Sequence, residues 1–196
     1  MSENRYFLGG SSPDGFRTHF GDIVGDTDYH TYIIKGGPGT GKSTLMKKLA
    51  AAYDGDKDIY FCSSDPDSYD AVVFRESKAV IVDGTAPHVF EPEYPGAVQE
   101  IVDLGAYWDS VSLQQKKKEI LLAQEKYSRH HLRCKRYISG AASVLSDTLQ
   151  ITEAAADKRR IEGFTGRLAK KILPSKSGGL GRLLFRQMAA LTPKGY

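Results

Sequence analysis

The chain contains the stretch Gly36-Gly37-Pro38-Gly39-Thr40-Gly41-Lys42-Ser43-Thr44, which fits the phosphate-binding pattern G-x-x-x-x-G-K-[ST], or Walker A. Glycines lack a Cβ, so successive backbone N–H groups can curl around a phosphate. Lys42 can place a positive charge on the β- and γ-phosphates, and the hydroxyl of Ser43 can bind Mg²⁺. The helix that follows points the positive end of its dipole at the anion. The stretch therefore predicts a nucleotide-binding site formed by Gly36, Gly37, Pro38, Gly39, Thr40, Gly41, Lys42, Ser43 and Thr44.

The sequence on either side of this loop fits the same interpretation. Residues 32–35, Tyr-Ile-Ile-Lys, have the short β-branched and aromatic pattern of a buried strand. After the loop, Leu45, Met46, Leu49 and Ala50 recur at helical spacing. Strand, glycine-rich loop and helix is the order that the motif requires, which argues against a chance glycine-rich turn.

Composition limits the class of protein. The chain has 196 residues, of which 40% are hydrophobic and 26% charged, as in ordinary globular proteins. Its longest apolar runs are far shorter than the roughly 18 residues that cross a bilayer. Two cysteines, Cys62 and Cys134, do not make a disulfide framework. We therefore expect a cytoplasmic protein with no membrane partner.

The two halves of the chain carry opposite charge. Residues 1–105 contain 9 Lys and Arg against 17 Asp and Glu, a net charge of −8. Residues 106–196 contain 18 against 7, a net charge of +11. The basic half is expected to meet something anionic, either nucleic acid, a substrate phosphate or the acidic half itself.

The pattern of apolar segments predicts an α/β fold, a P-loop NTPase with a mostly parallel sheet flanked by helices. Ligands of such sheets bind beyond the carboxyl ends of the strands. We expect strands at residues 5–8, 32–35, 59–62, 79–83 and 183–188, and a helix after the loop to about residue 53. Short helices are expected near 67–74 and 98–105, and residues 16–30 are expected to form a short helix or a loop.

The chain divides into three predicted parts. Residues 1–105 form the nucleotide-binding core, 106–173 a basic helical insertion, and 174–196 a return strand and linker. One continuous helix from residue 112 to 158 would be about 70 Å long. We therefore expect a break near Ser139-Gly140 and a helical hairpin. The basic residues of the insertion could form a solvated surface, a lid over the triphosphate or a nucleic-acid surface.

The tail repeats an earlier segment of the chain. Residues 192–196, Thr-Pro-Lys-Gly-Tyr, echo residues 12–16, Ser-Pro-Asp-Gly-Phe. The echo predicts that a second copy of the module begins at the end of this chain.

Asp83 is the candidate Walker B acid. Four apolar residues precede it and place it at the end of a strand, where it could hold Mg²⁺ beside Ser43. A plain turn-initiating aspartate before Gly84 is the alternative. Because residue 84 is glycine, the glutamate that activates water in many ATPases is missing from its expected place.

The general base must then come from elsewhere. Asp65 follows the neighbouring strand and could touch the attacking water or an acceptor hydroxyl, although an Asx-type turn before Pro66 would explain it as well. His88 could sense the γ-phosphate, or cap loop backbone groups. The candidate catalytic residues are therefore Lys42, Asp83, Asp65 and His88.

Three blocks together resemble a known family: the Walker A loop, residues 62–65 (Cys-Ser-Ser-Asp) and residues 82–88 (Val-Asp-Gly-Thr-Ala-Pro-His), supported by residues 94–98. The chain resembles the poorly characterised bacterial P-loop ATPases built as tandem NTPase modules, mostly from Gram-positive anaerobes and spore formers. It is similar to their first, N-terminal module. The resemblance implies ATP as the ligand and a second P-loop module as a partner, and it implies no particular substrate.

The expected function is binding of a nucleoside triphosphate, ATP or GTP, with Mg²⁺, followed by slow hydrolysis. ATP is preferred because of the resemblance, and no N-K-x-D motif for reading guanine is present in the sequence. Two alternatives stay open: a small-molecule or nucleotide kinase, and a nucleotide-gated module that binds nucleic acid or a protein.

Overall fold

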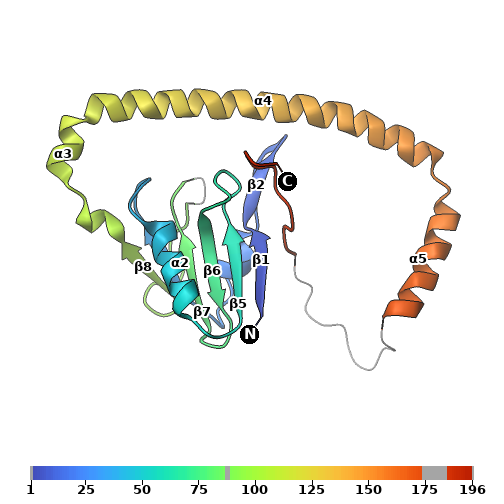
Figure 1. Ribbon diagram of the computed structural model, residues 1–196, viewed down its shortest axis with the longest axis horizontal. Helices are drawn as coiled ribbons and strands as arrows, with labels where there is room; N and C mark the ends of the chain where they lie inside the picture. The colour runs from blue at the N-terminus through green and yellow to red at the C-terminus, as the bar shows by residue number, and fades with distance from the viewer. Residues whose placement is uncertain (1, 87–88, 174–184, 196) are drawn as a thin grey trace.

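The structure is a computed structural model that describes residues 2–86, 89–173 and 185–195. Within these residues the centre is a six-stranded sheet with the order β1-β5-β6-β7-β4-β8 (Figure 1). Its strands are β1 (Glu3–Phe7), β4 (His30–Lys35), β5 (Lys57–Phe61), β6 (Tyr69–Phe74), β7 (Ala79–Asp83) and β8 (Gln99–Asp103). The expected mixed α/β class with a mostly parallel sheet is confirmed.

β6 is the antiparallel member of this sheet. The pairs β1/β5, β4/β7 and β4/β8 are parallel, whereas β6 runs antiparallel to both β5 and β7. The helix expected at residues 67–74 is therefore wrong. The connections at residues 62–68 and 75–78 are too short to carry a crossover helix, so the chain turns back as a meander. Val72 and Val73 are both buried, as in a strand covered on both faces.

The helix expected near residues 98–105 is also wrong, because this segment forms β8 at the edge of the sheet. Its residues pair with Thr31–Lys35 of β4. The buried side chain of Gln99 fixes its start: Oε1 accepts hydrogen bonds from the amides of Glu93 and Tyr94 at 2.8 and 2.9 Å, and Nε2 donates to the carbonyl of Val24 at 3.2 Å. Backbone pairing and this buried amide outweigh the helical spacing of the apolar residues.

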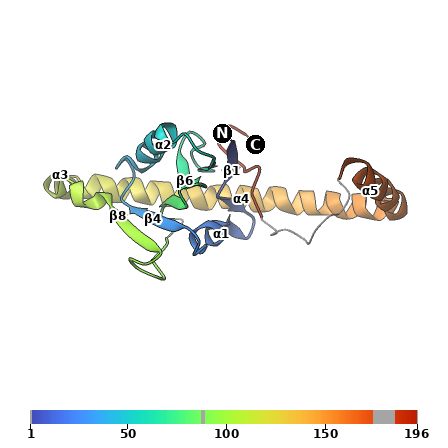
Figure 2. The same ribbon diagram turned by 90° about the horizontal axis from the view of Figure 1, so that it is seen from below.

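The core lies on both faces of the sheet. Alternate residues of β4 point to opposite sides, so Ile33 packs with the apolar residues around α1 (Phe20–Val24), and Ile34 packs against α2 (Lys42–Ala52). The α1 side contains Leu8, Phe20, Ile23, Val24, Ile33, Tyr60, Ala71, Val73, Val80 and Val82; the α2 side contains Ile34, Met46, Ala50, Val72, Phe74 and Ile81. Figure 2 shows α1 and α2 on opposite sides of the sheet.

β2 (Gly9–Ser12) and β3 (Gly15–Thr18) pair with each other as an antiparallel hairpin. The tail forms the same kind of turn. In each turn the hydroxyl of the first residue donates to the carbonyl of the glycine, Ser12 to Gly15 at 2.7 Å and Thr192 to Gly195 at 2.6 Å. Both glycines have positive φ, +130° and +108°. The two segments that are similar in sequence therefore also form similar turns, over residues 12–15 and 192–195.

The rest of the tail lies beside the first strand. Of the strand expected at residues 183–188, residues 183–184 fall outside the described residues, and Gln187 makes a single antiparallel bridge to Phe7. The amide of Phe7 donates to the carbonyl of Gln187 at 2.9 Å, and Ala190 is buried.

Residues 104–172 are helical but do not fold into a hairpin. They form the short 3-10 turn η1 (Leu104–Tyr107), α3 (Ser110–Gln115), α4 (Lys117–Ala155) and α5 (Lys158–Ile172). The break expected at Ser139-Gly140 is wrong, because α4 continues through it for 39 residues, about 58 Å. A glycine inside a helix costs only about 1 kcal/mol, which is too little to end it. The helix is not confined to the core: it passes over the β2–β3 hairpin and extends beyond the sheet (Figure 1).

Candidate functional site

The glycine-rich loop connects the carboxyl end of β4 to the start of α2. Gly39 has φ of +81° and Gly41, at the start of the helix, has φ of +90°. A side chain at either position would strain the backbone by roughly 1–2 kcal/mol. Thr40 holds the turn by donating from Oγ1 to the carbonyl of Gly37 at 2.8 Å. The glycines of the motif are thus needed for the shape of this loop.

Lys42 folds back across the loop. Its Nζ donates to the carbonyls of Gly36 and Gly37, at 2.8 and 3.0 Å, and only 11% of its side chain is exposed. The ammonium is therefore held at the centre of the loop by backbone groups that could exchange for an anion.

Asp83 faces this lysine from the neighbouring strand. Because β7 runs parallel to β4 and beside it, the carboxyl ends of the two strands meet, and Asp83 Oδ2 lies 3.6 Å from Lys42 Nζ. The other oxygen, Oδ1, accepts hydrogen bonds from the amide and hydroxyl of Thr85, the amide at 2.9 Å. Asp83 thus starts the turn that was weighed as the alternative from the sequence, and its other oxygen faces Lys42.

Position 84, directly after Asp83, has no space for a side chain. A Cβ on Gly84 would lie 2.3 Å from Cγ2 of Ile33, a buried residue of β4. The amide of Gly84 also donates to the carbonyl of Ile34 at 3.0 Å, which holds the two segments together. A glutamate cannot be accommodated here without moving β4.

Ser43 is directed toward the start of β6. Its Oγ accepts a hydrogen bond from the amide of Tyr69 at 3.0 Å. This contact orients the hydroxyl and leaves it one lone pair and its proton. Ser43 and Asp83 each offer a hard oxygen donor, the ligand type that Mg²⁺ prefers.

Asp65 is engaged within its own turn. One carboxylate oxygen accepts from the hydroxyl of Ser68 and the other from the amide of Asp67 at 3.3 Å. The Asx-type turn weighed from the sequence is thus present, and these bonds would have to open before Asp65 acts as a base. His88 lies outside the described residues.

Two residues that the sequence did not single out as site candidates lie near the loop, one of them in contact with it. Lys35, the last residue of β4, donates to the carbonyls of Gly84 and Phe90 and pairs with Glu91 at 2.7 Å. Trp108, which follows η1, has Cζ2 3.4 Å from the place where a Cβ on Gly37 would stand, and 47% of the side chain is exposed. Neither lies in a motif, and the contact of Trp108 with the loop depends on the placement of β8 beside β4.

Cys62 is excluded as a nucleophile by its surroundings. Burial at the end of β5, together with the nearby charge of Asp70, raises the pKa of this thiol to about 11. The thiolate, which is the reactive form, is therefore scarce at neutral pH.

Within residues 2–86, 89–173 and 185–195, the structure places no three His, Cys, Asp or Glu side chains where they could share a metal ion. In the same residues none of the helices is long and apolar enough to span a bilayer. Comparison with protein-family models, with curated proteins and with solved structures found no match.

Proposed function

We propose that this chain is a P-loop NTPase module that binds a nucleoside triphosphate, with ATP as the expected nucleotide, and hydrolyses it slowly. The observation that carries the proposal is the 3.6 Å approach of Lys42 Nζ to Asp83 Oδ2 across two parallel strands. Lys42 and Asp83 are 41 residues apart in the sequence, and chance composition alone would not bring the two motifs together at one edge of a sheet. The carboxyl edge is also where ligands of parallel sheets bind.

In this proposal the loop supplies the phosphate site. The triphosphate replaces the carbonyls of Gly36 and Gly37 as partners of Lys42, and the amides that follow Gly39 donate to its oxygens. The carbonyls of Gly36 and Gly37 are neutral acceptors, whereas phosphate oxygens carry negative charge, so the ammonium of Lys42 would be attracted more strongly to the phosphates.

The donor set fits Mg²⁺. Ser43 and Asp83 would hold the ion together with phosphate oxygens and water, and the ion would neutralise charge on the β- and γ-phosphates. Asp83 has one oxygen free of the Thr85 turn for this purpose, and that oxygen lies 3.6 Å from Lys42 Nζ.

Slow turnover follows from the residues around the γ-phosphate position. Gly84 stands where a water-activating glutamate would, and Ile33 leaves no room for its side chain. Asp65 is held by Ser68 and Asp67. Hydrolysis would then rest on positioning and electrostatics without a strong general base.

Binding can be measured by calorimetry and by the fluorescence of Trp108, the only tryptophan of the chain. Lys42→Ala should weaken binding of Mg²⁺-ATP at least about a hundredfold, because the buried ammonium is the main charge on the phosphates. Lys48→Ala, on the exposed side of α2, is the matched control and should bind normally. Normal ATP binding by Lys42→Ala would show that this loop is not the nucleotide site.

Asp83→Asn separates binding from turnover. The amide keeps the size of the side chain and can still accept from Thr85, so nucleotide should bind. Mg²⁺-dependent phosphate release should fall by at least about a hundredfold, since the metal loses its charged ligand. Release of labelled phosphate to water, and not to an added acceptor, would distinguish hydrolysis from the kinase alternative.

A further inference from the structure

α5 is an amphipathic helix whose apolar side is in water. Ile161, Phe164, Leu168 and Ile172 follow at spacings of three and four, so they form one stripe along the helix. These four side chains are 56%, 59%, 40% and 66% exposed. Asp157 caps the N-terminus of the helix by accepting a hydrogen bond from the amide of Arg160 at 3.1 Å. A helix of 15 residues is nevertheless only marginally stable in water unless it packs against a partner.

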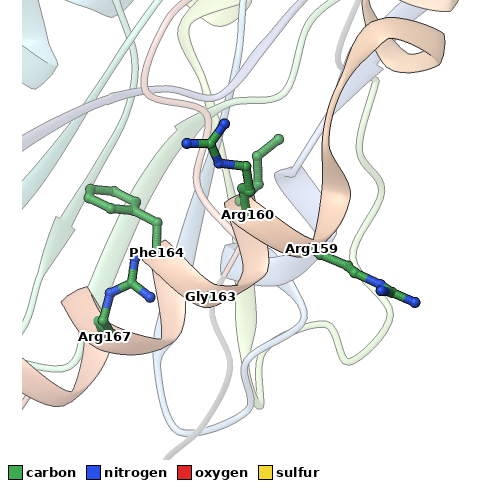
Figure 3. Close-up of a pocket in the computed structure, with 6 residues that line it drawn as sticks. Arg159, Arg160, Gly163, Phe164 and Arg167 are labelled. Carbon is green, nitrogen blue, oxygen red and sulfur yellow. The ribbon is translucent and has the colours of Figure 1, made fainter.

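The other sides of α5 are strongly basic. Six of its 15 residues are Lys or Arg against one acid, Glu162. Figure 3 shows Arg160 and Phe164 extending from one side of the helix while Arg159 extends from the other, and Gly163, without a side chain, leaves an open depression between the arginines. Phosphate-sized anions therefore have access to guanidinium groups directly beside the apolar stripe.

The partner must offer apolar and anionic groups together. A nucleic acid would match the charges but leave the four apolar side chains in water. A second α5 packed through the stripe would bring two helices of like charge together. An anionic bilayer surface meets both requirements, because acyl chains lie directly beneath its phosphate groups.

We propose that α5 binds the surface of anionic membranes, lying in the interface with Ile161, Phe164, Leu168 and Ile172 toward the acyl chains. α4 supports this role, since it carries α5 away from the sheet in both views (Figures 1 and 2). The sequence-based expectation of no membrane partner concerned spanning segments. A helix that lies on a surface needs none.

The test is sedimentation of the whole chain with vesicles of neutral phosphatidylcholine, and with vesicles in which about 30% is anionic phosphatidylglycerol. We expect at least about tenfold tighter binding to the anionic vesicles, weakening as salt rises from about 50 to 300 mM. Equal binding to both kinds of vesicle, or no binding at low salt, would overturn the proposal.

Variants test the stripe itself. Phe164→Ser with Leu168→Ser keeps the charge of α5 and should reduce vesicle binding about tenfold or more. Val144→Ser with Leu149→Ser, two exposed apolar residues of α4, is the matched control and should bind as the unchanged chain does. Circular dichroism checks that the helical content of each variant is retained. Equal loss in both pairs would refute a role specific to α5.

Two further measurements address the other partners. Labelled duplex DNA that binds tightly and is unaffected by the Phe164 and Leu168 changes would assign the basic side to nucleic acid instead. Sedimentation velocity that shows a dimer lost in the same variant would assign the stripe to a second copy of the chain. Either result would overturn the membrane proposal.

Discussion

Gly84 determines how closely two strand ends approach. A Cβ at this position would overlap Ile33 of β4, whose side chain is fully buried and cannot move aside. We therefore expect Gly84→Ala to lower the free energy of unfolding by about 1–3 kcal/mol, the usual cost of overpacking a core. Urea unfolding followed by circular dichroism measures this loss.

A second glycine provides the control. Gly21 lies in α1, and a Cβ there would meet no atom within 4 Å. Gly21→Ala should leave stability unchanged or raise it by up to about 1 kcal/mol, because alanine favours a helix. Equal urea midpoints for both variants would show that Gly84 does not limit the packing of β7 against β4.

Cys62 gives a pH-dependent prediction. Its thiol has a pKa of about 11 in the folded chain against 9.0 for an ordinary thiol, because burial disfavours the charged form. The contribution to stability is therefore complete below pH 9 and is lost as pH rises from 9 toward 11. At pH 8, iodoacetamide should alkylate the exposed Cys134 well before Cys62. Mass spectrometry of timed samples checks the order, and faster labelling of Cys62 would contradict the burial.

At the level of elements, the sequence predicted what local chemistry determines. The two strands that end at Lys35 and Asp83 are β-branched runs closed by a charged residue, and both are present in the structure. The glycine-rich loop connects the first of them to a helix, as its sequence predicted. β6 and β8 were missed because a short apolar run fits either a strand or a helix, and pairing with distant strands decides between them. The 3.6 Å approach of Lys42 to Asp83 could be expected from two parallel strands, whereas the contact of Trp108 with the loop depends on β8.

The continuity of α4 can be tested by a distance measurement. The sequence analysis favoured a hairpin with a break near Gly140, because one helix of about 70 Å is longer than the core. In the structure α4 is continuous and has no buried residue. Spin labels at Ile120→Cys and Thr152→Cys, with both native cysteines replaced by alanine, should be about 48 Å apart. Pulsed electron paramagnetic resonance measures the distance between the two labels. A separation below about 25 Å would indicate the hairpin instead.

On the scale of the whole molecule, the charge split follows the architecture. The acidic residues 1–105 contain the six-stranded sheet and the candidate nucleotide site, and the basic residues lie mostly on α4 and α5. The hydroxyl of Ser139, in the middle of α4, donates to the carbonyl of Pro13 at 3.3 Å. α4 therefore touches the sheet domain at the β2–β3 hairpin.

The tail connects the end of the chain to the first strand. Residues 185–195 bridge Phe7 through Gln187, bury Ala190, and place Lys194 2.6 Å from Asp67 in the connection between β5 and β6. Removing residues 185–196 would expose the edge of β1 and the surface around Gly10, where Gln187 and Ala190 lie. We expect the free energy of unfolding to fall by about 1–3 kcal/mol, the value of one lost backbone bridge and a few buried methyl groups.

Hydrogen exchange locates this effect. The amide of Phe7 donates to Gln187, so its exchange should become faster when the tail is removed, while the amides inside β4 should change only with global stability. Lys194→Ala is the control: an exposed ion pair contributes little, so this variant should lose less than about 0.5 kcal/mol and keep Phe7 protected. If the amide of Phe7 exchanges equally fast with and without the tail, residues 185–195 do not protect the edge of β1.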